Sequence, residues 1–353
     1  MKNFLFALFL AAPLSAQAQH WVWISPDEID QLPDSGPAWN SMKAAADRFV
    51  ADSHFVLANQ DDKRDSEAMA AAMVWQRTGD PSYRAAVEAG CLDVIGQEDQ
   101  DFPGENNTSL ELSRNVCAIV IAAELIEWSD PEAEASFRSW VSMIRTYERE
   151  DGRSITSTHE DRPNNWGTHA GASRLACSIY LEDWEDVSRC ARVFGGWLGV
   201  RGLYSGFSYG ELCWQADQTR PVGINPRGAT LAGISVDGVL PDDQRRSGRC
   251  PPEISQENYV YEALQGVTAQ AVMFDRLGLE EVWTVRHAAL YRAFAWLHEE
   301  ALFPAEGDDV WQAWVVNKAY DLGLSAFPSP QGGVGHGKSV GWTDWTTQAI
   351  SWP

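Results

Sequence analysis

The sequence predicts an all-α fold, an incomplete α/α toroid in which antiparallel helix hairpins surround a cleft and carry long irregular loops. Apolar residues recur every three or four positions along most of the chain, which is the period of an amphipathic helix. Short breaks separate these segments, and short connections place successive helices antiparallel. Strand-like pieces are limited to residues 202–204 and 233–239. A stacked solenoid would show a clearer sequence repeat than this chain does.

The expected helices follow one another with polar or proline-containing breaks between them. In the first helix, Trp39 and Met42 are spaced so that they share a face. Asp-Pro pairs at residues 80–81 and 130–131 mark two of the breaks. The expected helices cover residues 37–57, 66–78, 81–94, 110–127, 133–147, 166–180, 184–198, 259–277 and 280–302.

Residues 195–252 differ from the rest of the chain because they are rich in Gly, Pro and Arg. A long irregular segment inside a compact domain is usually either functional or disordered. Its aromatic residues argue against disorder. We therefore expect an ordered functional loop, and since no linker divides the chain, residues 19–353 are expected to form one domain.

The first 18 residues predict a secretory signal peptide. Lys2 precedes an apolar run at residues 4–13, and Ala16-Gln17-Ala18 fits a small-x-small cleavage site. No later stretch approaches the roughly 20 apolar residues that a transmembrane helix needs. The mature protein is expected to be soluble and either secreted or periplasmic.

The formal net charge of −23 argues against nucleic acid or an anionic membrane as a partner. An acidic surface also keeps an exported protein soluble. If the substrate is itself anionic, the few Arg and Lys residues must be concentrated where it binds. The sequence does not decide the oligomeric state.

Six cysteines in an exported chain predict disulfide bonds. Cys177 and Cys190 are the expected local pair, since they join neighbouring helices across the turn at residues 181–183. No CxxC or Cys/His pattern of the zinc type is present, so we expect no structural zinc.

A cluster of polar and aromatic residues lies at the start of the helix expected at residues 166–180. Asn164, Asn165 and Trp166 follow a proline, and His169 lies one turn further on. Asn165 and His169 share a helix face if the helix begins near Asn164. Helix capping explains one Asn, but it does not require a second Asn, a Trp and a His beside it. We therefore interpret the cluster as half of an active site.

A second cluster combines arginines with tyrosines. Arg245, Arg246 and Arg249 occur within five positions, and Tyr259 and Tyr261 follow on the next expected helix. Guanidinium groups bind carboxylates in bidentate geometry, so this cluster is a candidate site for an acidic substrate. Solvated loop arginines and a core tyrosine are the alternative interpretation.

The order of the helix pairs and two motifs resemble the alginate lyase superfamily, polysaccharide lyases with an α/α toroid. The motifs are Asn-Asn-Trp-x-x-His at residues 164–169, and Asp-Gly-x-Leu-Pro at 237–241 followed by arginines and Tyr-x-x-x-Ala-Leu at 259–264. The resemblance spans about residues 100–280. It implies β-elimination on a 4-linked uronic acid polymer, such as polymannuronate (alginate) or glucuronan, in which an Asn and an Arg hold the C5 carboxylate and a His and a Tyr transfer protons.

The resemblance also implies roles for individual residues. Asn165 resembles the amide that neutralises the carboxylate, His169 the base or its partner, and Tyr259 the acid and base. Arg246 or Arg249 would be the guanidinium. This chain departs from many relatives because the His does not directly follow the Asn, and because the spacing from Arg to Tyr is longer. The expected substrate contacts are Asn164, Trp166, Arg245, Arg249, Tyr261, Trp214, His336 and Lys338.

The chemistry is consistent without the resemblance. A C5 proton beside a carboxylate becomes removable when hydrogen-bond donors offset the charge on that carboxylate. A Tyr beside arginines has its phenolate favoured by positive charge, so Tyr259 could act as base toward C5 and as acid toward O4. His169 is the alternative base, because the ordinary histidine pKa is near neutrality. No metal or cofactor is required.

Other functions are compatible with parts of the sequence. A toroidal glycoside hydrolase needs two carboxylates, for which Glu160, Asp161, Asp237 and Glu257 are candidates. A non-catalytic carbohydrate-binding protein would explain the 17 tryptophans, whose indole faces pack on sugar rings.

Two further patterns match catalytic motifs by letter. Residues 206–210 match Gly-x-Ser-x-Gly, and residues 332–339 match a P-loop, but neither has the flanking strand and helix that its chemistry needs. His336 and Lys338 are candidate substrate contacts from a loop, and a simple surface loop is the alternative interpretation.

Overall fold

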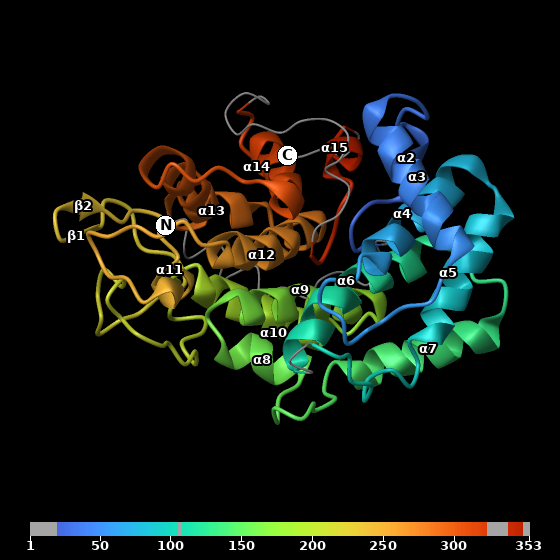
Figure 1. Cartoon of the computed structure of the whole chain (residues 1–353), viewed down its shortest axis with the longest axis horizontal. Helices are drawn as coiled ribbons and strands as arrows, with labels where there is room; N and C mark the ends of the chain where they lie inside the picture. The colour runs from blue at the N-terminus through green and yellow to red at the C-terminus, as the bar shows by residue number, and fades with distance from the viewer. Residues whose placement is uncertain (1–19, 105–107, 323–337, 349–353) are drawn as a thin grey trace.

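The computed structural model describes residues 20–104, 108–322 and 338–348 (Figure 1). The predicted signal peptide and His336 lie outside the described residues. The helices are α2 (Pro26–Asp30), α3 (Pro37–Ala51), α4 (Arg64–Thr78), α5 (Pro81–Asp93), α6 (Ser109–Leu125), α7 (Pro131–Ile144), α8 (Ile155–Asp161), α9 (Asn165–Tyr180), α10 (Trp184–Trp197), α11 (Pro241–Gln244), α12 (Tyr259–Arg276), α13 (Val285–Ala295), α14 (Val310–Ala319) and α15 (Thr343–Thr346).

Successive helices pack into two layers around a centre formed by α6, α9 and α12 (Figure 1). The inner helices α4, α6, α9 and α12 each contact the next, and α14 contacts α12. The outer helices α3 and α5 lie against α4, while α8 and α10 lie against α9. The predicted all-α toroid is therefore confirmed, and α9 with its neighbours lies at its centre.

Local sequence signals explain where the helices begin. Thr108 and Glu111 form a capping box at α6, in which each side chain accepts a hydrogen bond from the other residue's backbone N–H. Asp80 and Asp130 cap α5 and α7, each followed by a proline in the first turn. These caps lie at the predicted breaks, and most helix ends agree with prediction to within a few residues. The exception among the long helices is α3, which ends at Ala51 rather than at residue 57.

The helix predicted at residues 280–302 is wrong in its continuity. The structure has a 3₁₀ turn at Glu280–Trp283, then α13, then a π-helical turn at Trp296–Glu300. Within α13, residues 286–288 have φ values of 53°, 62° and 55°, which lie in the left-handed region. The apolar period runs through this segment, so the sequence pattern does not reveal the change of backbone conformation.

The Gly-, Pro- and Arg-rich segment contains very little β-structure. Thr230–Leu231 (β1) and Ile234–Ser235 (β2) form one short antiparallel pair, and the strand expected at residues 202–204 is replaced by a turn at 201–203 and irregular chain. Further 3₁₀ turns lie at Arg245–Ser247 and Gly307–Asp309. Residues 199–258, which we call the wall segment, therefore consist mostly of ordered irregular chain.

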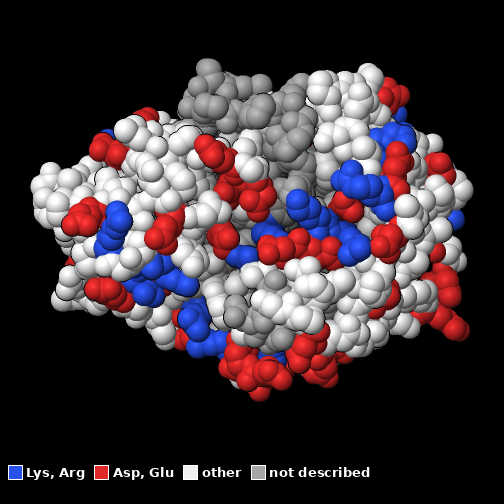
Figure 2. Space-filling view, viewed as in Figure 1, with Lys and Arg blue, Asp and Glu red and all other residues white. Residues whose placement is uncertain are grey.

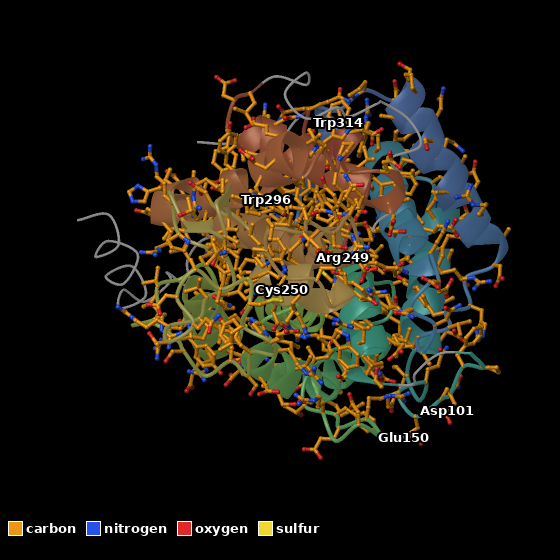
Figure 3. The ribbon with its side chains drawn as sticks, turned by 60° about the vertical axis from the view of Figure 1, so that its left-hand side comes forward. Asp101, Glu150, Arg249, Cys250, Trp296 and Trp314 are labelled. Carbon is orange, nitrogen blue, oxygen red and sulfur yellow. A yellow bond between two sulfur atoms is a disulfide. The ribbon has the colours of Figure 1, made fainter. Side chains whose placement is uncertain are left out.

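The predicted disulfide between Cys177 and Cys190 is wrong. Both side chains are buried free thiols on α9 and α10, and burial raises their pKa. The disulfide instead joins Cys213 to Cys250, whose Cα atoms lie 5.6 Å apart within the wall segment (Figure 3). Spacing along the chain does not reveal which irregular stretches lie side by side, and this is why the pairing was missed.

Two glycines allow α9 and α12 to approach each other closely. A Cβ added to Gly266 would lie 2.3 Å from the carbonyl carbon of Thr168, and one added to Gly171 would lie 2.5 Å from the side chain of Gln270. The backbones of the two helices therefore nearly touch beside His169.

Among the described residues, no helix combines the length and apolar character that crossing a membrane requires.

Candidate active site

Side chains from three inner helices meet at the N-terminus of α9. The side-chain amide of Asn165 donates to Oε2 of Glu262 on α12 at 3.0 Å, and the guanidinium of Arg114 on α6 forms an ion pair with the same oxygen. Arg114 also donates to Oε1 of Gln60 at 2.8 Å. One carboxylate thus joins α6, α9 and α12 and brings two hydrogen-bond donors together.

The start of α9 is held by its neighbours. Asn164 is buried and caps the helix, since its Oδ1 accepts from the Trp166 N–H at 3.3 Å. The Asn165 N–H donates to Oδ1 of Asp243 at 3.0 Å. The two asparagines therefore have different roles: Asn164 caps the helix, and the side-chain amide of Asn165 bonds Glu262. The Oδ1 atom of Asn165 is buried and has no hydrogen-bond partner within the described part of the chain.

Tyr259 is the first residue of α12 and lies three positions before Glu262, so the two side chains share a helix face. The Tyr259 side chain is half-buried, and the guanidinium carbon of Arg246 lies 4.4 Å from the centre of its ring. This distance is that of a cation–π contact. The fold therefore brings Tyr259, Arg246 and Asn165, predicted from separate motifs, into one region.

His169 lies one turn beyond Asn165 and is fully buried. Its Nδ1 is 2.9 Å from Oγ of Ser339, and its Nε2 is buried without a hydrogen-bond partner among the described residues. Burial, followed by the positive charges of Arg114 and Lys338, holds the His169 pKa well below its usual value. The imidazole is therefore neutral, and it lies beneath Ser339.

A short C-terminal stretch crosses the inner helices. The Lys338 N–H donates to Oε1 of Gln265 at 2.7 Å, and the Ser339 N–H donates to the Arg114 carbonyl at 3.3 Å. The Lys338 ammonium lies 3.8 Å from a carboxylate oxygen of Asp61. The positive charge of Lys338 therefore lies near that of Arg114. Figure 2 shows basic and acidic side chains side by side along the middle of one face of the molecule.

Two buried carboxyls accompany these cations. Asp309 accepts from Nε2 of Gln265 at 2.7 Å, and burial raises its pKa to about 7. Asp65 is also buried, and desolvation raises its pKa to about 7 against the opposing charge of Lys338. Near neutral pH both groups therefore exchange protons readily.

The remaining predicted arginines lie on the wall segment. Arg245 donates from Nε to Oδ1 of Asp242 at 2.9 Å, and this ion pair occupies its guanidinium. Arg249 has an exposed side chain, and its carbonyl accepts from the Trp214 indole at 2.7 Å. Of the two candidates for the catalytic guanidinium, Arg246 is therefore the one placed beside Tyr259.

Two predicted substrate contacts are corrected by the structure. Trp214 is fully buried and packs edge-on against Trp296, with ring centres 6.3 Å apart. Tyr261 is also fully buried and donates its hydroxyl to the Phe303 carbonyl at 2.6 Å. Residue type suggested both contacts, but both side chains point into the core. Tyr261 lies two positions after Tyr259 on α12 and so faces the opposite side of the helix, and Trp214 lies in a turn of the wall segment. Trp166 remains half-exposed, with Arg162 stacked 5.1 Å from its ring centre.

Sequence reasoning missed Arg114, Glu262 and Asp309. Arg114 lies inside the apolar run of α6, and a charged residue in such a run was a signal that it faces a polar cleft. Glu262 lies within the Tyr-x-x-x-Ala-Leu motif but has no distinctive neighbour in sequence. Asp309 follows a break in the helical pattern and could not be distinguished from an ordinary surface acid.

Three of the four acids considered for a hydrolase are held in ion pairs with arginines. Glu160 is bound by Arg174 and Arg189, Asp161 by Arg153, and Asp237 by Arg292. Each therefore belongs to a separate ion pair. Ser208, in the Gly-x-Ser-x-Gly pattern, lies in irregular chain rather than between a strand and a helix.

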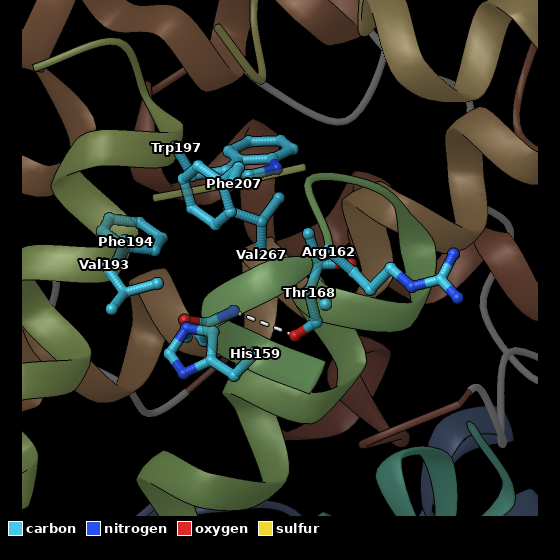
Figure 4. Close-up of a pocket in the computed structure, with 10 residues that line it drawn as sticks. His159, Arg162, Thr168, Val193, Phe194, Trp197, Phe207 and Val267 are labelled. Atoms are coloured by element: carbon cyan, nitrogen blue, oxygen red, sulfur yellow. Dashed lines mark hydrogen bonds between the residues drawn. The ribbon is translucent and has the colours of Figure 1, made fainter. Parts of the chain in front are cut away.

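A small internal cavity lies behind α9 and is separate from the cleft (Figure 4). Its volume is about 10 Å³, enough for roughly one water molecule. Gln270 donates across it to the Thr168 carbonyl at 2.9 Å, and burial lowers the pKa of His159 to about 3. We interpret this cavity as part of the packing between α9, α10 and α12.

One group of residues has spacing that could suit a metal ion within the described chain, namely Glu211, Cys213 and Cys250. The two cysteines form the disulfide, so they offer no thiolate.

The two helix layers define an α/α toroid with Asn, Arg, Tyr and His side chains near its centre. A solved structure with this architecture is alginate lyase A1-III from Sphingomonas species A1, with a TM-score of 0.50 and 12% sequence identity. The match covers 99% of this chain and 93% of that chain. It confirms the alginate lyase-like fold that the motifs predicted. No protein-family model matches the chain, and no curated protein matches it in sequence.

Proposed function

We propose that this protein is a polysaccharide lyase that cleaves a 4-linked polyuronate, such as polymannuronate or glucuronan, by β-elimination. The observation that carries the proposal is the position of Tyr259. It is half-exposed, stacked under Arg246, and one helical turn from the carboxylate that joins Asn165 to Arg114. A proton carrier therefore lies beside the donors that a uronate carboxylate requires.

In this mechanism, the amide of Asn165 and the guanidinium of Arg114 hold the C5 carboxylate and withdraw charge from it. The Tyr259 phenolate removes the C5 proton, the C4–O4 bond breaks as the C4–C5 double bond forms, and the Tyr259 hydroxyl then protonates O4. Arg246 lies over the Tyr259 ring, where its positive charge can offset the negative charge that develops on the substrate. The proton passes from C5 to Tyr259 and then to O4, so Tyr259 serves both steps.

His169 is better suited to a positioning role than to proton removal. Its imidazole is fully buried under Ser339 and is held neutral by burial. A base must reach the proton that it removes, and in this arrangement Tyr259 is the more accessible of the two. We therefore assign the transfer steps to Tyr259.

Glu262 occupies the place that this mechanism gives to the substrate. A uronate carboxylate held by Asn165 and Arg114 would compete with Glu262 for both donors, since one carboxylate oxygen of Glu262 contacts both. The ion pair keeps the two donors together in the free enzyme. Substrate binding then requires Glu262 to release at least one of them.

Other residues extend the site along the polymer. Trp166 presents a half-exposed indole with Arg162 on its ring, and Lys338 places an ammonium at the cleft edge. We assign both to binding of neighbouring uronates, as we do His336, which precedes Lys338 in the chain. The predicted signal peptide and the disulfide support export, and the net charge of −23 makes the clustering of cations at the cleft more distinctive.

The test is ultraviolet absorbance of the purified protein with polymannuronate, glucuronan and pectate, alongside a reducing-end assay. Elimination creates a conjugated double bond, so absorbance should rise together with the reducing ends. Tyr259→Phe should lower the rate by about 10²–10⁴-fold. The matched control is Tyr147→Phe, which removes a hydroxyl that contacts Asp99 outside the cleft. Absence of the double bond with every polymer would contradict the proposal.

One observation favours a second candidate, a hydrolase with Glu262 and Asp309 as its carboxyls. Burial raises the pKa of Asp309 to about 7, which suits a general acid, whereas Glu262 is held by a cation. New reducing ends without new absorbance would favour this reaction, and Asp309→Asn should then abolish it.

A further inference from the structure

A basic pocket lies apart from the cleft, between the end of α10 and the start of α13. Arg201, Arg220 and Arg286 line it together with Gly199 and Asp217, and its volume is about 280 Å³. None of the pocket's lining residues belongs to the cleft. Three arginines thus converge on one hollow in a chain that carries 27 basic and 50 acidic residues.

These arginines lack the partners that other arginines in the protein have. Among the described residues, no carboxylate lies within ion-pair distance of Arg201, Arg220 or Arg286. By contrast, Arg292 beside them is bound by Asp237 at 2.5 Å. Asp217 lines the pocket, but its carboxylate accepts hydrogen bonds from the backbone and hydroxyl of Thr219. The charge of Asp217 interacts with that of Arg220, but the two groups form no ion pair. In so acidic a protein, three neighbouring arginines without an ion pair in the described part of the chain are a distinctive feature.

Burial makes the lack of a partner more costly for Arg286. Its pKa is lowered by desolvation first and then by the positive charges of Arg292 and Arg220, with no acidic group acting in the opposite direction. Like charges held together in partly desolvated surroundings attract an anion from solution. The positive charge of Arg286 in this pocket is therefore not offset by a neighbouring acidic group.

The backbone is shaped to present Arg286 to this pocket. Residues 286–288 all have left-handed φ values, which are unfavourable for residues with a side chain and which persist only where the surroundings hold them. Arg292 stabilises this backbone conformation by donating hydrogen bonds to the carbonyls of Arg286 and His287, each at 3.2 Å. On the opposite side, Gly199 has a φ of 98°, and an added Cβ would lie 3.3 Å from Nε of Arg286. Glycine thus leaves room for the guanidinium.

A second arginine is also positioned by the backbone. Nη1 of Arg201 donates to the Pro221 carbonyl at 2.5 Å, which leaves its other guanidinium nitrogens for a ligand. Guanidinium groups bind planar and tetrahedral oxyanions through paired N–H donors.

We propose that Arg201, Arg220 and Arg286 form an oxyanion-binding site outside the cleft. The ligand is a carboxylate, sulfate or phosphate group, which comes either from an anionic saccharide or from a free inorganic ion. The site does not depend on the proposed lyase activity, because it contains no residue of the cleft and inorganic ions suffice to test it.

The experiment is isothermal titration of the full-length mature protein with sodium sulfate, sodium phosphate and a mannuronate oligosaccharide. Ionic strength is held constant with chloride, because screening weakens all such contacts. The variants are Arg286→Gln and Arg220→Gln. The matched control is Arg227→Gln, which removes the same charge from an exposed position of the wall segment that does not line the pocket.

At least one of the three oxyanions should bind the wild-type protein, and either pocket variant should weaken that binding by tenfold or more, while Arg227→Gln leaves it unchanged. Loss confined to the oligosaccharide identifies a saccharide ligand, and loss confined to sulfate or phosphate identifies an inorganic ion. Circular dichroism of each variant checks that it is folded, and the Arg220 variant, which lies outside the left-handed turn, guards against misfolding of Arg286→Gln. Equal affinity in wild type and both variants, or no binding of any of the three, would overturn the proposal.

Discussion

The floor of the cleft and the wall segment beside it satisfy their polar groups in different ways. The floor consists of α6, α9 and α12, whose backbone groups hydrogen-bond within each helix. The side chains of Arg114, Asn165 and Glu262 therefore contact one another between the helices. In the wall segment, side chains replace the missing backbone partners. Gln215 bonds both the N–H and the carbonyl of Val222, at 3.0 and 2.9 Å.

Other wall side chains do the same. The amide of Asn225 donates to the Trp214 carbonyl at 2.8 Å, and the Trp214 indole donates to the Arg249 carbonyl. Buried backbone groups need partners, and an irregular chain can find them only in side chains. Most buried polar residues of the wall are therefore structural, whereas those of the floor remain available for chemistry. The following changes test that difference, from the largest expected effect to the smallest.

The wall segment should depend on its disulfide more than on packing. Replacing Cys213 and Cys250 by Ser releases a loop with a sequence separation of 37 residues, which should lower the free energy of unfolding by about 4 kcal/mol. Urea denaturation of the double variant measures the loss, and reductant added to the wild-type protein should reproduce it. An unchanged urea midpoint would mean that side-chain bonds alone hold the wall.

The floor should depend on close helix packing. In Gly266→Ala the added methyl would lie 2.3 Å from backbone atoms of Thr168, so α9 and α12 must separate, at a cost of about 3 kcal/mol. The control is Gly202→Ala in the wall segment, where no atom lies within 4 Å of the added Cβ. We expect that control to change stability by no more than about 0.5 kcal/mol. Similar effects from both substitutions would remove the distinction between floor and wall.

Glu262 should weaken substrate binding, because it competes with the substrate carboxylate for Asn165 and Arg114. Glu262→Gln keeps the acceptor for Asn165 but removes the charge that competes for Arg114, so KM for the cleaved polyuronate should fall about tenfold, equivalent to ~1.4 kcal/mol. The control is Glu257→Gln, an exposed acid just before α12. A fall in kcat with unchanged KM would instead assign Glu262 to the chemical step and favour the hydrolase.

The buried carboxyl of Asp65, on α4 next to the floor, should give the protein a distinct pH dependence of stability. Its pKa is about 7 in the folded protein against 3.8 ordinarily, so its stabilising contribution is complete below about pH 4 and is lost as pH rises toward 7. Asp65→Asn removes this dependence. The stability of the variant relative to wild type should therefore increase by about 1.4 kcal/mol between about pH 5 and pH 6. Paired urea titrations measure the difference, and a difference independent of pH would show that Asp65 ionises normally.

The local elements of the fold were predictable because their causes are local. Helix caps such as Thr108 with Glu111, and the apolar period within each helix, act over a few residues. The interruption at residues 286–288 was not predictable, because left-handed backbone there is held by Arg292 through contacts that no periodic pattern encodes. The choice of Cys213 with Cys250 over Cys177 with Cys190 likewise required knowledge of the wall's path.

The candidate site was predictable in part. The sequence predicts Asn165, His169 and Tyr259 as site residues because polar and aromatic residues are concentrated at helix starts. Their partners were not identified, since Arg114 and Glu262 lie 148 positions apart and meet only when α6 and α12 pack against α9. Burial also redirected Trp214 and Tyr261, which residue type alone had placed in contact with substrate.

The sequence by itself determined the helical toroid, the acidic character of the chain and the residue types that the cleft presents, because periodicity, capping and charge are properties of neighbouring residues. Only the tertiary structure decided which arginine pairs with which carboxylate. Arg114 pairs with Glu262 in the floor, whereas Arg201, Arg220 and Arg286 converge beside α13 and form no ion pair with any described residue. Ion pairing depends on distances of a few ångströms between distant parts of the chain, and packing alone sets those distances.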